Sequence, residues 1–228
     1  MEQTPLLCGP TALWMVLRAN QVRVPLEEVT KTVYTPDARG TYKQDLLAGA
    51  RRFGLAPYPV DSPYEMIYHL ARGRPVVVFH STGFLWKNFW HYSVLTGYDL
   101  ARETFTIHIG PFENKELPMA DVLRSWMEGG RWSYVLLKPG QIAEFARPEE
   151  AVDNALVFLR IGFTGAAERL AEAASARWPG DSRPEILLAD ALAHRGFPAL
   201  ARAHLRRALA RDPGNVALKS KVAGLGRE

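Results

Sequence analysis

The sequence has little cysteine, since Cys8 is the only one among 228 residues. A single thiol excludes a disulfide framework and a multi-cysteine metal site, and it is either a buried hydrophobic residue or a nucleophile. No run of 18 apolar residues occurs, so no transmembrane segment is predicted. No charged stretch followed by an apolar one opens the chain, so no signal peptide is predicted. The sequence leaves the localisation open: an exported or periplasmic protein is expected if a leader was removed before Met1, and a cytoplasmic one otherwise.

Long basic runs are also missing, although the net charge is +4. Residues 1–145 carry 15 Lys and Arg against 14 Asp and Glu, and residues 146–228 carry 13 against 10. No five consecutive basic residues occur, and no nucleic-acid motif is visible. The excess is arginine spread over predicted helix faces, which indicates solvated surface. Nucleic acid is therefore not an expected partner.

The composition changes near residue 145. Of 24 aromatic residues, 20 lie in residues 1–145, whereas alanine rises from 10 residues there to 19 in the last 83. Aromatic and β-branched runs favour sheet, and alanine with scattered leucine favours close-packed helices. A Pro139-Gly140 break marks the junction. The sequence predicts a first domain over 1–142 and an all-α domain over 148–228.

The second domain is an internal repeat with a period of 34 residues. This shift pairs alanine with alanine, glycine with glycine and proline with proline, as in Ala155 with Ala189, Gly162 with Gly196 and Pro179 with Pro213. The period resembles the tetratricopeptide repeat, although the usual Trp and Tyr of its first helix are missing. We predict repeats over 148–181 and 182–215 with a capping helix at 216–225. Two repeats are fewer than a free-standing solenoid needs, so they should pack on the first domain or on a protein partner. A generic helical appendage is the alternative.

The first domain reads as helices followed by strands, an α+β layout. Apolar periodicity predicts a helix over 10–19, and Ser62-Pro63-Tyr64-Glu65 is a capping box that opens a second helix. A short apolar run at 75–79 predicts a central strand. Segments 91–98 and 104–109 predict a hairpin, and 132–137 a last strand.

Cys8 lies directly before Gly9-Pro10 and the first helix. Free N–H groups and the helix dipole at this position favour a thiolate and should lower the thiol pKa. Gly9 removes a side chain that would shield the sulfur. Five residues upstream, Gln3 offers an amide that can donate to an oxyanion beside the Cys8 N–H.

Among six histidines, His91 is the strongest candidate for a general base, because it starts a strand after an aromatic loop over 84–90. His194 and His204 belong to the repeat helices as surface residues. His80, His91 and His108 could meet on adjacent strands, but they lack the spacing of compact zinc sites, and no metal is predicted. The loop, with Trp86 and Trp90, lines a cleft for an extended peptide, touches a membrane interface, or is aromatic filler.

Together these residues carry a family resemblance. Gln3, then Cys8-Gly9-Pro10-Thr11-Ala12-Leu13, then His91-Tyr92-Ser93-Val94 resemble the papain-like bacteriocin-processing, or double-glycine, cysteine peptidases. The likeness is greatest to the stand-alone bacterial branch that carries tetratricopeptide repeats, and it covers about residues 1–142. It implies a papain-like α+β fold with helices packed on an antiparallel sheet, and it implies no cofactor.

The resemblance also implies roles for single residues. Cys8 would be the nucleophile, His91 the base, and Gln3 part of the oxyanion hole. Apart from the resemblance, the local pattern makes Gly9, Trp86 and Trp90 the candidates for lining the substrate cleft. The family's third member is an Asp or Asn on the strand after the histidine, but residues 106–111 hold no acid. His108 or Ile109 falls at that place, and Asp99 is another candidate.

The expected reaction is hydrolysis of a peptide or amide bond through a Cys8 thioester. The alternative is a weak or inactive peptidase fold that binds a peptide segment while the repeats recruit a partner protein. A third class of function is that of a pure adaptor, in which the repeats recruit a partner and the first domain is a scaffold. The presence of both Cys8 and His91 favours the enzyme.

Overall fold

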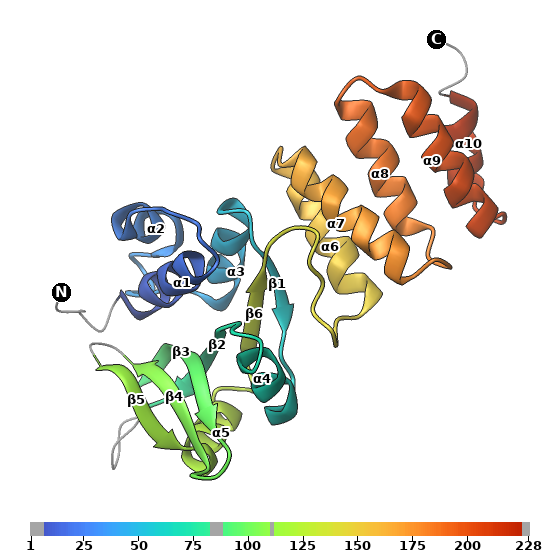
Figure 1. Cartoon of the computed structure of the whole chain (residues 1–228). Coiled ribbons are helices and arrows are strands. Elements are labelled where there is room, and N and C mark those ends of the chain that lie inside the picture. Colours follow the sequence, from blue (N-terminus) through green and yellow to red (C-terminus); the bar gives the residue numbers. More distant parts are fainter. Residues whose placement is uncertain (1–6, 83–88, 110–111, 225–228) are drawn as a thin grey trace. The chain divides into compact units, whose positions relative to one another are not determined.

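A computed structural model describes residues 7–82, 89–109 and 112–224. It divides into two compact units, Met1–Leu136 and Leu137–Glu228 (Figure 1). The predicted junction at 142–148 falls in the irregular segment that precedes the first helix of the second unit.

The first unit is α+β, as the sequence predicted. Its helices are α1 (Cys8–Ala19), α2 (Leu26–Val33), α3 (Lys43–Arg52), α4 (Pro63–Leu70) and α5 (Met119–Glu128). Its strands are β1 (Ala56–Pro59), β2 (Val76–Ser81), β3 (Trp90–Asp99), β4 (Thr104–Ile109), β5 (Phe112–Pro118) and β6 (Ser133–Leu137). They form one sheet in the order β1-β6-β2-β3-β4-β5. The pairs β2–β6, β2–β3, β3–β4 and β4–β5 are antiparallel, which confirms the predicted hairpin and central strand.

Local signals account for the helix starts. The Ser62 hydroxyl accepts a hydrogen bond from the Glu65 N–H at 3.2 Å, as the capping box requires. Helix α1 begins at Cys8, two residues before the predicted start. Pro10 then lies in the first turn, where its missing N–H breaks no helical hydrogen bond. The earlier start makes Cys8 itself a helical residue.

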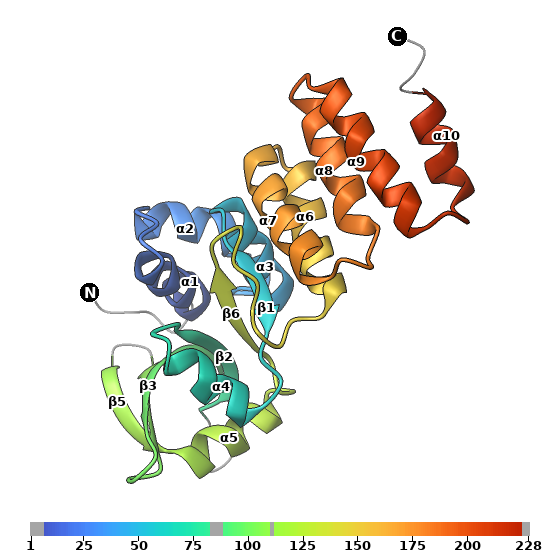
Figure 2. The ribbon, with the colours of Figure 1, turned by 45° about the vertical axis from the view of Figure 1, so that its right-hand side comes forward.

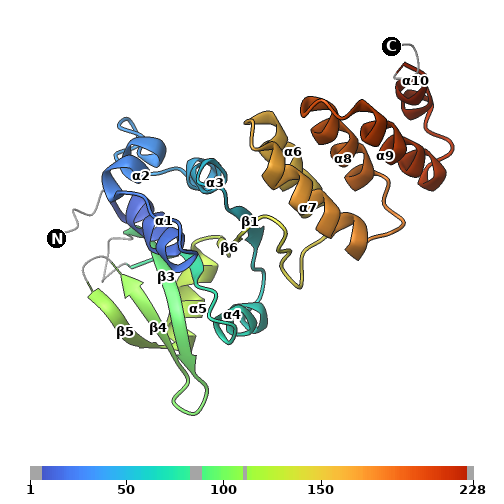
Figure 3. The same ribbon diagram turned by 45° about the horizontal axis from the view of Figure 1, so that its top comes forward.

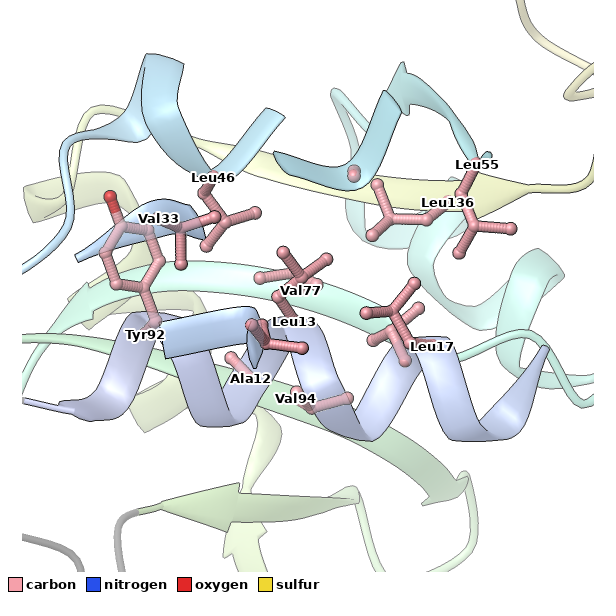
Figure 4. Close-up of a cluster of buried hydrophobic side chains, with 13 residues drawn as sticks. Ala12, Leu13, Leu17, Val33, Leu46, Leu55, Val77, Tyr92, Val94 and Leu136 are labelled. Carbon is pink, nitrogen blue, oxygen red and sulfur yellow. The ribbon is translucent and has the colours of Figure 1, made fainter. Parts of the chain in front are cut away.

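The core of the first unit lies between α1–α3 and one face of the sheet. Figure 4 shows Leu13 and Leu17 of α1 beside Val77 of β2 and Val94 of β3. Helix α1 lies along β3, as Figure 3 shows. Full burial of one such Leu or Val side chain contributes about 1.5–3 kcal/mol. This packing fixes the start of α1 against β3.

The second unit is all-α, as predicted. Its helices are α6 (Pro148–Arg160), α7 (Thr164–Arg177), α8 (Arg183–His194), α9 (Pro198–Arg211) and α10 (Val216–Gly224), each packed on the next (Figure 2). The bounds of α7 and α9 differ by 34 residues at both ends. Gly162 and Gly196, one period apart, end their helices with positive φ values of 83° and 81°. The assignment to the tetratricopeptide family stays a prediction. Within the described ranges, no helix is long and apolar enough to cross a membrane.

Candidate active site

Cys8 is the first residue of α1, and its thiol is partly buried against the sheet. The backbone N–H groups of Tyr92, Gly9 and Cys8 face the thiol and act to lower its pKa. Burial raises the pKa of the Cys8 thiol, and this effect exceeds the lowering by the three N–H groups. The sequence expectation of a lowered pKa is therefore wrong. The helix terminus is present, but its packing on the sheet removes the water that would solvate a thiolate.

Gly9 is buried beside the loop that carries Thr41. A Cβ on Gly9 would lie 2.5 Å from the Thr41 Cβ, closer than two such atoms can approach. The Tyr92 hydroxyl donates to the Thr41 carbonyl at 3.0 Å and holds the same loop. Gly9 therefore permits a close contact between α1 and this loop. The expectation that Gly9 opens the substrate cleft is corrected by this contact.

The effect of the Tyr92 N–H on the thiol pKa indicates where the sulfur lies. Phe79, the cross-strand partner of Tyr92, donates its N–H to the Trp132 carbonyl at 3.0 Å, on the β6 side. The Phe79–Tyr92 pair is then non-hydrogen-bonded, and the Tyr92 N–H points away from β2, toward the β4 edge. Sγ of Cys8 thus lies beside the edge of β3, next to the residue that follows His91.

His91 is opposite His80 in the β2–β3 register. Because side chains alternate along a strand, His91 and Ser93 share the face of His80, whereas Tyr92 and Val94 face α1. The Nε2 atom of His91 is buried and has no hydrogen-bond partner in the described part of the chain. Burial lowers the pKa of His91, which favours the neutral imidazole that a base requires. Among the described residues, no hydrogen bond joins His91 to the Cys8 thiol.

His80 is held by two serines. Ser125 on α5 donates its hydroxyl proton to the Val122 carbonyl at 2.9 Å, so it accepts from His80 Nδ1 at 3.2 Å. His80 Nε2 lies 2.8 Å from the Ser93 hydroxyl, which donates to it. Burial and the charge of His91 lower the pKa of His80 to about 4. His80 is therefore a neutral residue that ties α5 to the sheet, a role that the sequence analysis missed. The alternation of β2 and β3 would have placed it beside His91.

The structure separates the candidate third members from His91. His108 is opposite Val94 and therefore faces α1, where it lines a pocket together with Cys8. Ile107 and Ile109 share the face of His91 instead. The expectation that His108 orients His91 is thus wrong, because the two imidazoles extend from opposite faces of the sheet.

Asp99 is also removed from the site. It ends β3, eight residues beyond His91 and roughly 26 Å away along an extended strand. Its carboxylate accepts from the N–H groups of Ala101 and Arg102 at 2.9 and 3.0 Å. Asp99 is a turn residue, which corrects its place as a candidate. In the described ranges, no three His, Cys, Asp or Glu side chains gather as metal ligands.

An aromatic wall stands next to the start of β3. The rings of Trp90 and Phe79 stack with centroids 5.6 Å apart, and the centroids of the Phe79 and Tyr92 rings are 4.9 Å apart. Lys43 places Nζ 4.4 Å above the Phe79 ring and donates to the Gly129 carbonyl at 3.0 Å. Trp90 remains 47% exposed and can contact a ligand. Gln3 and Trp86, the other predicted site residues, lie outside the described residues.

Comparison with known proteins gives one family. Residues 1–133 match the model of the Peptidase_C39 like family. No curated protein matches the chain.

Solved structures also align with the chain. A C39-like peptidase from Bacillus anthracis is 17% identical and covers 57% of this chain and 88% of its own, with a TM-score of 0.49. A double glycine motif protease from a transporter, solved with its leader peptide, is 24% identical over 58% of this chain and 83% of its own, with a TM-score of 0.44. A Streptococcus peptidase domain is 16% identical and covers 57% of this chain and 90% of its own, with a TM-score of 0.48. The assignment rests on the family model.

Proposed function

The chain belongs to the peptidase C39-like family, and on that premise we propose that it hydrolyses a peptide or amide bond through a Cys8 thioester. One observation supports this most: the Cys8 thiol packs against Tyr92, the residue next to His91. His91 therefore directly precedes the residue that contacts the sulfur, and its Nε2 is buried without a hydrogen-bond partner in the described part of the chain. A thiol and a neutral imidazole brought to the same end of β3 supply the nucleophile and the base that acyl transfer requires.

The proposed reaction has two halves. His91 takes the thiol proton, and the thiolate attacks the carbonyl carbon of the substrate. The Cys8 N–H and the Gln3 amide donate to the oxyanion, and the imidazolium then protonates the leaving amine. In the second half, His91 deprotonates a water that attacks the thioester and releases the acid. No cofactor takes part in this scheme.

A second function is favoured by one observation. The β4 positions on the face of His91 hold Ile107 and Ile109, so no carboxylate there orients the base. Loss of the orienting acid can cost orders of magnitude in rate. The same fold would then hold an extended peptide beside Trp90 without cutting it efficiently, while the helical unit recruits a protein partner.

Mass spectrometry of a mixed-sequence peptide library separates the two functions. We expect the full chain to release fragments that Cys8→Ala does not release, and His91→Gln to slow their release about 100-fold or more. Rapid mixing should also trap an acyl adduct on the only cysteine. Peptide retention without fragments or adduct would favour the binding function and contradict the enzyme.

A further inference from the structure

We propose that a pocket at the end of α1 binds a small anionic ligand, in which a carboxylate or a phosphate is attached to an apolar group. The pocket lies between the second half of α1 and residues 21–25, the segment that leads to α2. Arg18, one of its lining residues, follows Cys8 by about ten helical residues, or about 15 Å along the helix axis. The inference therefore goes beyond the proposed function, because it concerns a second site on the first unit.

The pocket has the size and the mixed lining of a small-molecule site. Its volume is about 590 Å³. Sites for small ligands usually have roughly 300–1,000 Å³, with apolar walls and a few polar groups that fix the orientation. Val22, Val24 and Pro25 supply apolar wall, and Arg18 and Arg23 supply two guanidinium groups. A ligand that fits this lining has an apolar part and a negative charge.

The indole of Trp14 forms a further wall that is held in place. Its Nε1 donates to the Val24 carbonyl at 3.0 Å, across the turn between α1 and α2. Gln21 reverses the chain with a φ of 64°, and the Val22 N–H donates to the Leu17 carbonyl at 2.9 Å. The segment after α1 therefore returns beside Trp14, and the pocket has its shape without a ligand.

The two arginines of the pocket carry charges that no acid neutralises. The Cζ atom of Arg18 lies 4.8 Å from the centroid of the Trp14 ring, and this cation–π contact restricts the guanidinium. Within the part of the chain that the structure describes, neither Arg18 nor Arg23 forms an ion pair or a side-chain hydrogen bond. A guanidinium presents its N–H donors in a planar fork that matches the oxygens of a carboxylate or a phosphate.

Neighbouring groups leave this positive charge in place. Glu27 and Glu28, the acids nearest to the pocket in sequence, act on Lys31: Glu27 pairs with it at 2.7 Å, and Glu28 acts by its charge. At the end of α1, the carbonyls of Val16 and Arg18 already accept backbone N–H groups of the turn. An anion is therefore attracted to the pocket, and its apolar group gains from contact with the apolar walls.

The test is an NMR titration of the full chain, followed on the indole N–H of Trp14, whose resonance the Trp14→Phe variant identifies. The probes are phenylacetate for the carboxylate and phenyl phosphate for the phosphate. Benzyl alcohol is the neutral match, and acetate lacks the apolar group. Arg18→Gln and Arg23→Gln each remove one guanidinium of the pocket. Arg102→Gln, which breaks an exposed ion pair with Glu116, controls for the change of net charge.

We expect phenylacetate, phenyl phosphate or both to shift the Trp14 resonance with a Kd of about 1 mM or below. Benzyl alcohol and acetate should bind about tenfold or more weakly, because each lacks one half of the chemistry that the pocket recognises. Arg18→Gln and Arg23→Gln should weaken binding about tenfold, since each loses a hydrogen bond to a charged group. Arg102→Gln should bind as the parent does. The probe that binds more tightly identifies the head group.

Four results would overturn the inference: no shift at about 10 mM of either anion, an equal shift with benzyl alcohol, unchanged binding in both pocket variants, or an equal loss in Arg102→Gln. No peptide is cleaved in this titration. Its outcome is therefore independent of the hydrolysis experiment, and either can fail while the other succeeds.

Discussion

The thiol of Cys8 packs against Tyr92 and joins the start of α1 to the edge of β3. This contact places the Cys8 thiol beside β3 at the point where His91 and Tyr92 turn to opposite faces. It also buries the thiol. The same contact therefore positions Cys8 for reaction and makes its ionisation harder.

The first prediction concerns the pH dependence of that thiol. A raised pKa means that the thiolate accumulates only above the ordinary value of about 8.5. Alkylation of Cys8 should therefore continue to rise with pH beyond the point at which glutathione levels off. Intact mass reads a single site, because the chain has no other cysteine. A midpoint well below 8.5 would mean that a charged partner outweighs burial.

A second prediction follows from the missing acid. Ile109 shares the face of His91 and lies near the end of β4. Ile109→Asp should place a carboxylate where it can hold the imidazole and stabilise the imidazolium, so kcat should rise about tenfold or more. Ile109→Val is the matched control and should leave kcat unchanged. An aspartate variant that folds with unaltered turnover would show that the base is held by another group.

A third prediction tests the contact between α1 and the Thr41 loop. Gly9→Ala should lower the free energy of unfolding by about 1–3 kcal/mol, because its Cβ would overlap the Thr41 side chain. Gly165→Ala in α7 is the control, where the nearest atom lies at an ordinary 3.6 Å. There the better helix propensity of alanine should stabilise by up to about 1 kcal/mol. Denaturant titration compares them, and Thr41→Gly should rescue Gly9→Ala.

A fourth prediction concerns Glu185, which is buried in the second unit. One carboxylate oxygen accepts from Ser175 at 2.7 Å and pairs with Arg211 at 3.0 Å; the other lies 2.8 Å from His204. Burial raises the pKa of this carboxyl. The hydrogen bonds from Ser175 and His204 and the charge of Arg211 lower it by more than burial raises it, so the pKa of Glu185 is below its ordinary value.

Because the pKa of Glu185 is lowered on folding, its stabilisation is complete above the unfolded value of about 4.3 and is lost as pH falls through the folded value. Thermal melts should therefore show the second unit weakening in acid. Glu185→Gln should be less stable at pH 7 and should lose part of this pH dependence. If Glu185→Gln loses as much stability in acid as the parent chain does, then other carboxylates cause the weakening of the second unit.

Much of the fold was predictable because its signals are local. The Ser62 capping box, the alternation in the hairpin strands and the 34-residue period each depend on residues close in sequence, and each element is present. Strand β5 was not predicted, since it shows no alternation of apolar and polar residues: Glu113, Asn114, Lys115 and Glu116 are consecutive polar residues and all are exposed. Pairing with β4, rather than propensity, makes it a strand.

By itself the sequence determined which residues are the candidates for the chemistry, because a Cys-Gly-Pro helix start and a strand that opens on histidine are local patterns. Only the tertiary structure decided how those residues relate. Strand register assigned His91 and His108 to opposite faces, and close packing of α1 on the sheet reversed the expected shift of the Cys8 pKa. The first outcome depends on pairing between strands that are neighbours in the sequence, and the second on packing between α1 and β3, which are far apart in the sequence. Alternation and desolvation therefore follow from the partner segment rather than from adjacent residues.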